Sequence, residues 1–166
     1  MDASKQVAGV RQAAPPLDVL IIDDEKAFTK ACSQTLKKGG YSAAIAETGV
    51  QGLQIAGSAH PGVVLLELKA PGVNGPELLE KLAKTDPSAV PVVVTGQGTV
   101  DSAVESMKLG AFDFLTKPLE PEKLLETVRR ALSLSKLRKE SKSAGEQTPL
   151  SNKYDLLLQG LDVLGG

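Results

Sequence analysis

Short apolar runs alternate with longer amphipathic segments along most of the chain. Most of the runs are rich in β-branched residues and bounded by Gly, Pro or Asp, a pattern that predicts buried strands. The expected strands cover residues 18–23, 42–46, 63–66, 91–95 and 111–116. A segment with a helix start signal follows each of them. These helices are expected to begin at Glu25, Thr48, Pro76, Thr99 or Asp101, and Pro121.

Five strand–helix units in regular alternation predict an α/β fold with a parallel sheet covered by helices on both faces. Right-handed crossovers are nearly obligatory in such a sheet. The expected fold is therefore a flavodoxin-like, doubly wound (βα)5 domain whose five parallel strands run in the order 2-1-3-4-5. Chemistry in this architecture is expected at the carboxyl ends of the strands, near the switch point between strands one and three.

The length of 166 residues fits one domain of ordinary size with additional segments. Residues 1–16 are expected to form a flexible N-terminal arm, because they end in Ala-Ala-Pro-Pro. Residues 17–140 would form the domain, and residues 141–152 a linker. Residues 153–166 form a short apolar segment that must dock on something or stay disordered, because an isolated helix of this length is marginal in water.

Net charge is −1, which does not favour a nucleic-acid or membrane surface. The first residues lack the apolar core of a secretory signal, and no run is long enough for a membrane helix. We therefore expect a cytoplasmic protein. Cys32 is the only cysteine, so an intramolecular disulfide is excluded, and its expected role is a small buried hydrophobe on the first helix.

Polar side chains follow four of the five predicted strands. Asp23 and Asp24 end the first strand, Glu67 follows the third, Thr95 ends the fourth and Lys117 follows the fifth. The carboxyl ends of parallel strands share one edge of a sheet, so these groups should meet there. Clustered carboxylates repel one another unless a cation binds, and Mg²⁺ prefers such oxygen ligands.

This constellation resembles the receiver domain of two-component response regulators. The resemblance covers residues 17–138. Within it, the segment TGQGTVDSAVESMKLGAFDFLTKP at residues 95–118 is most similar to receivers of the nitrogen-regulator, enhancer-binding class. That class normally continues into an ATPase domain and a DNA-binding domain, which this sequence does not include. In receivers the lone carboxylate is a phosphorylated aspartate, whereas this chain has Glu67 at the phosphoacceptor position.

The resemblance implies a Mg²⁺ ion held by Asp23, Asp24, the carboxylate at position 67 and the backbone carbonyl of Lys69. It also implies that Thr95 donates a hydrogen bond to a phosphoryl oxygen. Phosphoryl transfer needs mainly positioning and stabilisation of charge, so these few groups are sufficient for it.

Three further positions take their roles from the same resemblance. Lys117 would supply the second positive charge at the phosphoryl group. Phe114 occupies the place of a rotating aromatic switch residue that acts together with Thr95. The Lys117–Pro118 peptide bond occupies a place where the family has a cis bond.

Glutamate carries its carboxylate about 1.5 Å farther from the backbone than aspartate does. Such a displacement is expected to weaken Mg²⁺ binding and phosphorylation, because a misplacement of about 1 Å can cost roughly a hundredfold in rate. The longer side chain would reach Lys117 or Thr95 directly. A negative group in that place partly imitates an aspartyl phosphate, so Glu67 is expected to bias the domain toward its active conformation.

The leading hypothesis is a signalling module that acts by protein contact and is not an enzyme. Its partners would be a histidine kinase, a downstream effector or a second copy of itself, bound through the fourth helix, fifth strand and fifth helix. The second hypothesis is a working phosphoacceptor or phosphorelay intermediate that uses Glu67 or a neighbouring carboxylate. A Mg²⁺-dependent phosphatase of the haloacid-dehalogenase type is a third, for which Asp23-Asp24-Glu25 gives only an imperfect motif.

Overall fold

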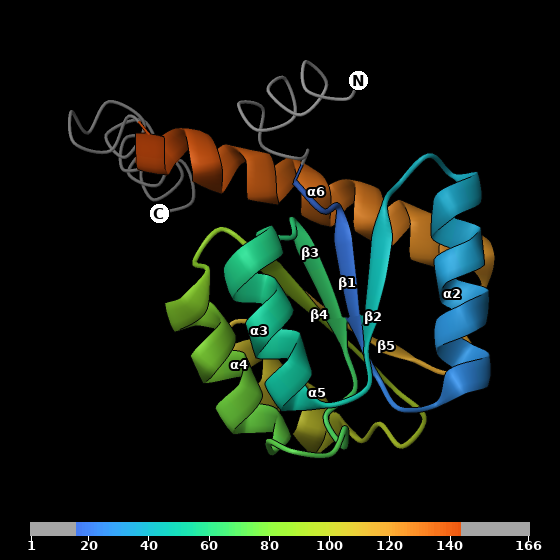
Figure 1. Ribbon diagram of the computed structural model, residues 1–166. Helices are drawn as coiled ribbons and strands as arrows, with labels where there is room; N and C mark the ends of the chain where they lie inside the picture. Colours follow the sequence, from blue (N-terminus) through green and yellow to red (C-terminus); the bar gives the residue numbers. More distant parts are fainter. Residues whose placement is uncertain (1–15, 144–166) are drawn as a thin grey trace, which may run out of the picture.

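A five-stranded parallel sheet forms the centre of the protein, and helices cover both of its faces (Figure 1). The computed structural model describes residues 16–143. Its elements are, in chain order, β1 (Val19–Ile22), α2 (Lys26–Lys38), β2 (Ala43–Ala46), α3 (Gly49–Ala59), β3 (Val63–Leu66), α4 (Gly75–Thr85), β4 (Val90–Thr95), α5 (Val100–Lys108), β5 (Asp113–Thr116) and α6 (Pro121–Ser143).

The strand order is β2-β1-β3-β4-β5, and all four neighbouring pairs are parallel. The predicted flavodoxin-like fold is therefore confirmed. In β1 and β3, Ile22 pairs with Leu66, so the residues that follow, Asp23 and Glu67, leave the sheet at the same level. The register itself thus places the acidic end of β1 beside Glu67.

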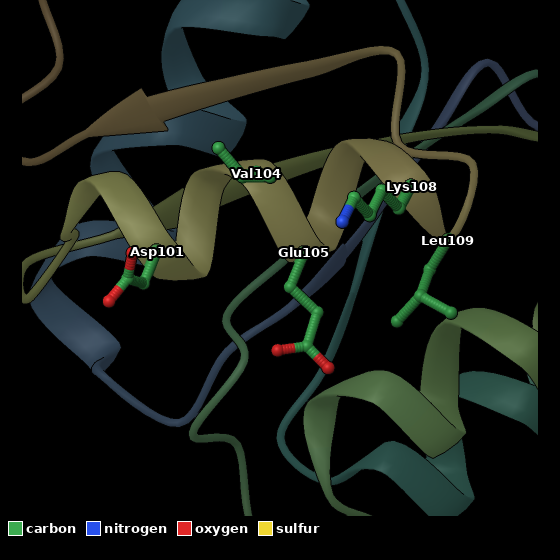
Figure 2. Close-up of a pocket in the computed structure, with 5 residues that line it drawn as sticks. All are labelled: Asp101, Val104, Glu105, Lys108 and Leu109. Carbon is green, nitrogen blue, oxygen red and sulfur yellow. The ribbon is translucent and has the colours of Figure 1, made fainter.

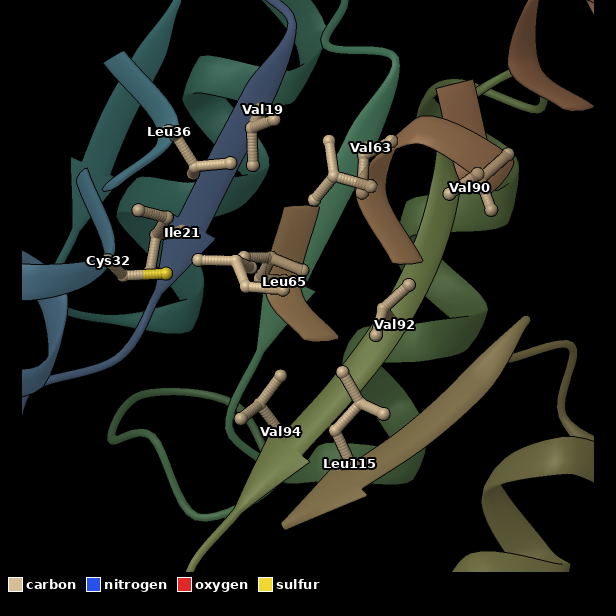
Figure 3. Packing of buried hydrophobic residues seen from close by; sticks show 13 residues of the cluster. Val19, Ile21, Cys32, Leu36, Val63, Leu65, Val90, Val92, Val94 and Leu115 are labelled. Atoms are coloured by element: carbon tan, nitrogen blue, oxygen red, sulfur yellow. The ribbon is translucent and has the colours of Figure 1, made fainter. Parts of the chain in front are cut away.

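The core consists of two apolar layers, one on each face of the sheet. Successive side chains along a strand point to opposite faces of the sheet, so each strand contributes residues to both layers. The layer under α2 and α6 is shown in Figure 3 and contains Val19, Ile21, Cys32, Leu36, Val63, Leu65, Val90, Val92, Val94, Leu115, Leu124, Val128 and Ala131. As expected, Cys32 is buried in this layer. The layer under α3 and α4 includes Leu20, Ile22, Val64, Leu66, Leu78, Leu79, Leu82 and Val93.

Side-chain caps begin three of the helices. Thr48 accepts a hydrogen bond from the backbone of α3, Asn74 does the same for α4, and Thr99 forms a reciprocal capping box with Ser102 at α5. Thr99 rather than Asp101 therefore starts α5. The last helix, α6, continues to Ser143, so residues 141–143 of the predicted linker are helical.

Helix α5 buries fewer of its side chains than the neighbouring helices do. Its apolar residues Val100, Val104 and Met107 are spaced to share one face of the helix. That face is exposed: 79%, 47% and 47% of their surfaces remain accessible. Ser106 is the buried residue of this helix. The periodicity therefore identified the helix but not a face that packs on the core.

Three of the predicted segments lie wholly or largely outside the described residues. These are the N-terminal arm at residues 1–16, the linker at 141–152 and the apolar segment at 153–166. Within residues 16–143, none of the helices combines the length and the apolar character that crossing a bilayer requires.

Candidate functional site

Loops at the carboxyl edge of the sheet form an acidic pocket. Asp23 follows β1, Glu67 follows β3, Thr95 ends β4 and Lys117 follows β5. The pocket encloses about 210 Å³ and is lined by Asp23, Asp24, Glu25, Glu67, Lys69, Thr95, Gly96, Gln97 and Lys117. The structure thus brings together the polar strand ends that the sequence places at one edge.

The ammonium group of Lys117 lies among three carboxylates and one aromatic ring. Its Nζ atom is 2.7 Å from Asp23 Oδ2, 2.7 Å from Glu25 Oε1 and 3.4 Å from Glu67 Oε1. The centre of the Phe28 ring is 4.4 Å away, within the range of a cation–π interaction. Burial alone would lower the pKa of Lys117, but its contacts with the Asp23 and Glu25 carboxylates raise that pKa to about 12.

Glu67 is buried, with 8% of its surface exposed, and its carboxylate is held at both oxygens. Oε1 faces Lys117, and Oε2 accepts a hydrogen bond of 3.3 Å from the backbone N–H of Lys69. The backbone of Glu67 itself donates to Ile22, which continues the pairing of β3 with β1. The longer side chain therefore reaches Lys117, the first of the two partners expected for it.

Thr95 also lines the pocket and is 4% exposed. Its hydroxyl accepts a hydrogen bond from the backbone N–H of Gln97, and no side-chain hydrogen bond joins it to Glu67 in the part of the chain that the structure describes. The Gln97 side chain accepts a hydrogen bond from Lys69 Nζ. The loops after β3 and β4 are therefore linked across the mouth of the pocket.

The predicted acidic pair divides into two different environments. Asp23 is buried, and its Oδ1 accepts a hydrogen bond from the backbone N–H of Glu25. Asp24 is exposed at the rim. The adjacent carboxylates are thus not equivalent, because the chain turns into α2 immediately after them.

Phe114 and the Lys117–Pro118 bond lie next to the pocket. The Phe114 ring is half-buried and packs against the backbone of Gly98, where an added Cβ atom would come within 2.7 Å of a ring carbon. A larger residue at position 98 would require the ring to shift. The Lys117–Pro118 peptide bond is cis.

Sequence reasoning missed three residues of this site. Glu25 and Phe28 contact Lys117, and Gln97 binds Lys69. Glu25 directly follows the acidic pair and Gln97 follows Thr95 by two positions, so proximity to a strand end was the available signal. For Phe28 the sequence offered no such signal, because an aromatic residue on an amphipathic helix is usually part of the core packing.

Two of the four predicted Mg²⁺ ligands, Asp23 and Glu67, contact protein groups in this arrangement. Asp23 Oδ2 has no hydrogen bond of regular geometry within the described residues, and its 2.7 Å contact with Lys117 is an ion pair. Both oxygens of Glu67 are also engaged. No group of three His, Cys, Asp or Glu side chains among residues 16–143 is arranged to hold a metal ion.

A second hollow lies along α5. It measures about 440 Å³ and is lined by Asp101, Val104, Glu105, Lys108 and Leu109 (Figure 2). Its residues combine apolar side chains with charged ones of both signs.

Comparison with protein families matches residues 19–129 to the response regulator receiver domain. Among curated proteins, the chain is 38% identical to the C4-dicarboxylate transport transcriptional regulatory protein DctD of Pseudomonas aeruginosa over 138 residues, which cover 83% of this chain and 29% of that protein. It is 32% identical over 127 residues to a putative response regulator NtrX-like of Rickettsia felis, covering 75% of this chain and 27% of that protein. The chain thus spans less than a third of the length of these two relatives.

Comparison with solved structures also finds receiver domains of response regulators. A CheY-like receiver domain protein from Methanospirillum hungatei has a TM-score of 0.69 at 31% identity, covering 75% of this chain and 99% of that one. The receiver domain of NtrX from Brucella abortus has a TM-score of 0.66 at 28% identity, covering 70% and 98%. With the strand order, the acidic pocket and the family match in agreement, the chain belongs to the response regulator receiver domain family.

Proposed function

We propose that this receiver domain acts as a signalling module in which Glu67 replaces the phosphorylated aspartate and imitates its charge. The observation that carries the proposal is the buried carboxylate of Glu67, 3.4 Å from the ammonium of Lys117. A phosphorylated aspartate would place its negative oxygens beyond the aspartate carboxylate, toward the same lysine. The extra methylene of Glu67 moves its carboxylate in that direction.

The imitation is expected to be partial. A carboxylate carries one negative charge and two oxygens, whereas a phosphoryl group carries about −1.5 to −2 and three terminal oxygens. Reversing a two-state equilibrium from 1:99 to 99:1 takes roughly 5.5 kcal/mol of differential interaction. One ion pair next to a solvent-accessible pocket supplies less, so the domain should populate its active conformation without occupying it fully.

Protein contact is the expected output, through the surface formed by α5, β5 and α6. The exposed Val100, Val104 and Met107 on α5 support this choice, because a clustered apolar face on a short helix is a typical contact site. A related solved structure, at 31% identity and a TM-score of 0.68, is described as the beryllofluoride-activated NtrC4 receiver domain dimer. A histidine kinase, a downstream effector or a second copy of this chain would fit that surface.

The test compares the unchanged chain with Glu67→Asp and Glu67→Gln. Each protein is incubated with a small acyl phosphate and Mg²⁺, and intact mass, backbone amide NMR spectra and sedimentation are recorded. We expect a gain of one phosphoryl group only in Glu67→Asp. After phosphorylation, the amide resonances of α5 and β5 in that variant, and its state of association, should approach those of the unchanged chain. Glu67→Gln keeps the length but loses the charge, so it should resemble unphosphorylated Glu67→Asp.

Two results would contradict the proposal. A stable gain of one phosphoryl group by the unchanged chain would identify a working phosphoacceptor instead. A spectrum of the unchanged chain that matches unphosphorylated Glu67→Asp would show that Glu67 does not imitate the phosphorylated state. Turnover of an aryl phosphate, which we do not expect, would favour a phosphatase.

A further inference from the structure

The loop after β3 enters helix α4 through an asparagine–glycine pair, Asn74 and Gly75. Asn74 is the N-cap of α4 and is exposed, whereas Gly75 is buried as the first residue of the helix. The chain has two asparagines, Asn74 and Asn152, and only Asn74 precedes a glycine. Glycine has no side chain to shield its backbone nitrogen, so this nitrogen can approach the amide carbon of the asparagine before it.

The fold requires a glycine at position 75. A Cβ atom there would come within 2.7 Å of Leu68 Cδ2 and 3.0 Å of the Leu68 backbone oxygen. Pro76 adds a second constraint, because a Cβ atom on the residue before a proline clashes with the proline ring in the helical conformation. A larger neighbour that would shield the Asn74 amide therefore does not fit at this position.

Two contacts with Glu77 hold the Asn74 amide in the cap. Its Oδ1 accepts a hydrogen bond of 2.8 Å from the backbone N–H of Glu77, and its Nδ2 donates one of 3.4 Å to Glu77 Oε1. Both polar atoms of the amide are thus engaged by residue 77. Attack by the Gly75 nitrogen requires the amide to leave these contacts, so the reaction takes place when the first turn of α4 opens.

We propose that Asn74 is a site of spontaneous deamidation, and that the isoaspartate formed there uncaps α4. The Gly75 backbone nitrogen loses its proton and forms a bond to Asn74 Cγ, the bond between Cγ and Nδ2 breaks, and ammonia leaves. Water then opens the resulting cyclic imide. Attack at Cγ gives an ordinary aspartate, and attack at the main-chain carbonyl carbon gives isoaspartate. No atom is oxidised or reduced, and water is the only co-reactant.

The two products differ in what they do to the helix. An ordinary aspartate keeps an oxygen at the N-cap, and its negative charge suits a helix N-terminus. In isoaspartate the main chain runs through the side-chain carbon, which lengthens the backbone by one methylene and removes the capping oxygen from its place. The loop between Glu67 and α4 then loses its attachment to the helix. This covalent change goes beyond the proposed function and does not depend on it.

The reaction is followed by peptide mass mapping of the folded chain during storage at mildly alkaline pH. We expect the peptide that contains Asn74 to gain the mass of an amide converted to an acid and to separate into two products. One should elute with the same peptide from Asn74→Asp, and the other should be methylated by an isoaspartyl methyltransferase. Asn152, which precedes a lysine, is the internal reference and should convert more slowly.

Two variants of Glu77 test the protection by the cap. Glu77→Ala removes the contact with Asn74 Nδ2 and should speed the reaction about two- to fivefold. Glu77→Gln keeps an acceptor oxygen and should react like the unchanged chain, although both variants lose the ion pair with Lys81. Equal rates in the two variants would contradict this protection. If Asn74 keeps its amide in the folded chain but converts in urea, the fold blocks the reaction and the proposal is wrong.

Amide hydrogen exchange in the first turn of α4 tests the structural effect. Exchange should be about fivefold faster in the isoaspartate form than in the unchanged chain. Asn74→Asp and Asn74→Ser both retain a capping oxygen, so they should exchange like the unchanged chain. Repair by the methyltransferase and its methyl donor should restore slow exchange. Equal exchange in the isoaspartate form and Asn74→Asp would overturn the uncapping. None of these measurements involves phosphorylation, so this proposal and the proposed function can fail separately.

Discussion

At the scale of single residues, the site is organised around Lys117 rather than around the acidic pair. Asp23, Glu25 and Glu67 come from the ends of β1 and β3 and from the start of α2, and each contacts the same ammonium group. To make these contacts, the aliphatic part of the Lys117 side chain extends from the end of β5 toward the ends of β1 and β3. A single flexible side chain therefore connects β5 to the two strands at the centre of the sheet.

We predict that Phe28 keeps Lys117 in place through its aromatic face and not only through its volume. Replacing it with Leu keeps an apolar side chain but removes a cation–π interaction of about 0.5–1 kcal/mol. The rate of amine modification at Lys117 should then rise about two- to fivefold. Phe28→Tyr, which keeps the ring, is the matched control and should behave like the unchanged chain. Equal rates in the Leu and Tyr variants would reduce the role of Phe28 to packing.

The sequence allowed the four strand-end groups to be predicted because strand ends are easy to locate. Glu67, Thr95 and Lys117 each follow an apolar run, and parallel strands bring such positions to one edge. The roles of Glu25 and Phe28 could not be predicted. They depend on where a lysine side chain with four rotatable bonds comes to rest, and no spacing along the chain encodes that.

At the scale of elements, the helices differ in how they are held. Three buried residues, Gly49, Gly52 and Ala56, attach α3 to the sheet, and Leu78, Leu79 and Leu82 attach α4. Helix α5 buries Ser106 and relies on the capping box at Thr99 for its start. Segments with few buried contacts open at low free energy, so α5 should be the most easily displaced of these helices.

We predict that Thr99→Ala loosens α5 without affecting the rest of the domain. Loss of an N-cap costs about 1 kcal/mol, which should speed amide hydrogen exchange within residues 100–108 about fivefold. Thr48→Ala removes the equivalent cap from α3 and is the matched control. Because α3 is anchored in the core, its amides should change less. Uniform acceleration over the whole domain in Thr99→Ala would mean that α5 opens only with global unfolding.

The bounds of the helices and strands were easier to predict from the sequence than the side of a helix that is exposed. The third strand was predicted at residues 63–66, the bounds observed for β3, because its four consecutive apolar residues end at Glu67. The exposed side of α5 could not be predicted, because spacing reveals that apolar residues share a face but not what covers it. Helix α6 continues into the predicted linker, to Ser143, because no Gly or Pro interrupts residues 122–143.

At the scale of the whole molecule, the stability of the fold depends on the protonation of two groups, the Cys32 thiol and the Lys117 ammonium. Burial, with a smaller contribution from the charge of Asp23, raises the pKa of the Cys32 thiol from 9.0 to about 12. The pKa of Lys117 also rises to about 12. Both groups keep their protons to higher pH in the folded state than in the unfolded state.

We predict that the free energy of unfolding falls as pH rises from about 9 to 12. The folded state binds more protons than the unfolded state in this window, so the slope of stability against pH is negative. Below about pH 9 both contributions are fully present. Urea unfolding at a series of pH values measures this slope. Cys32→Ala removes the thiol and should flatten the curve from about pH 9 to about 12, whereas Lys117→Met should flatten it only above 10.5.

An identical pH profile in Cys32→Ala and the unchanged chain would contradict the role assigned to the thiol. The Ala variant also leaves a small cavity, which should lower its stability at every pH by a similar amount. The comparison therefore depends on the shape of the curve and not on its height.

The burial of Cys32 has a practical consequence for spectroscopy. It is the only thiol among the 166 residues, it is 4% exposed, and the chain has no tryptophan. A cysteine introduced at Met107 on the exposed face of α5 would therefore be the one readily labelled position, and a tryptophan would be the one indole fluorophore. The unchanged sequence therefore needs no cysteine or tryptophan removed before α5 is followed with a single probe.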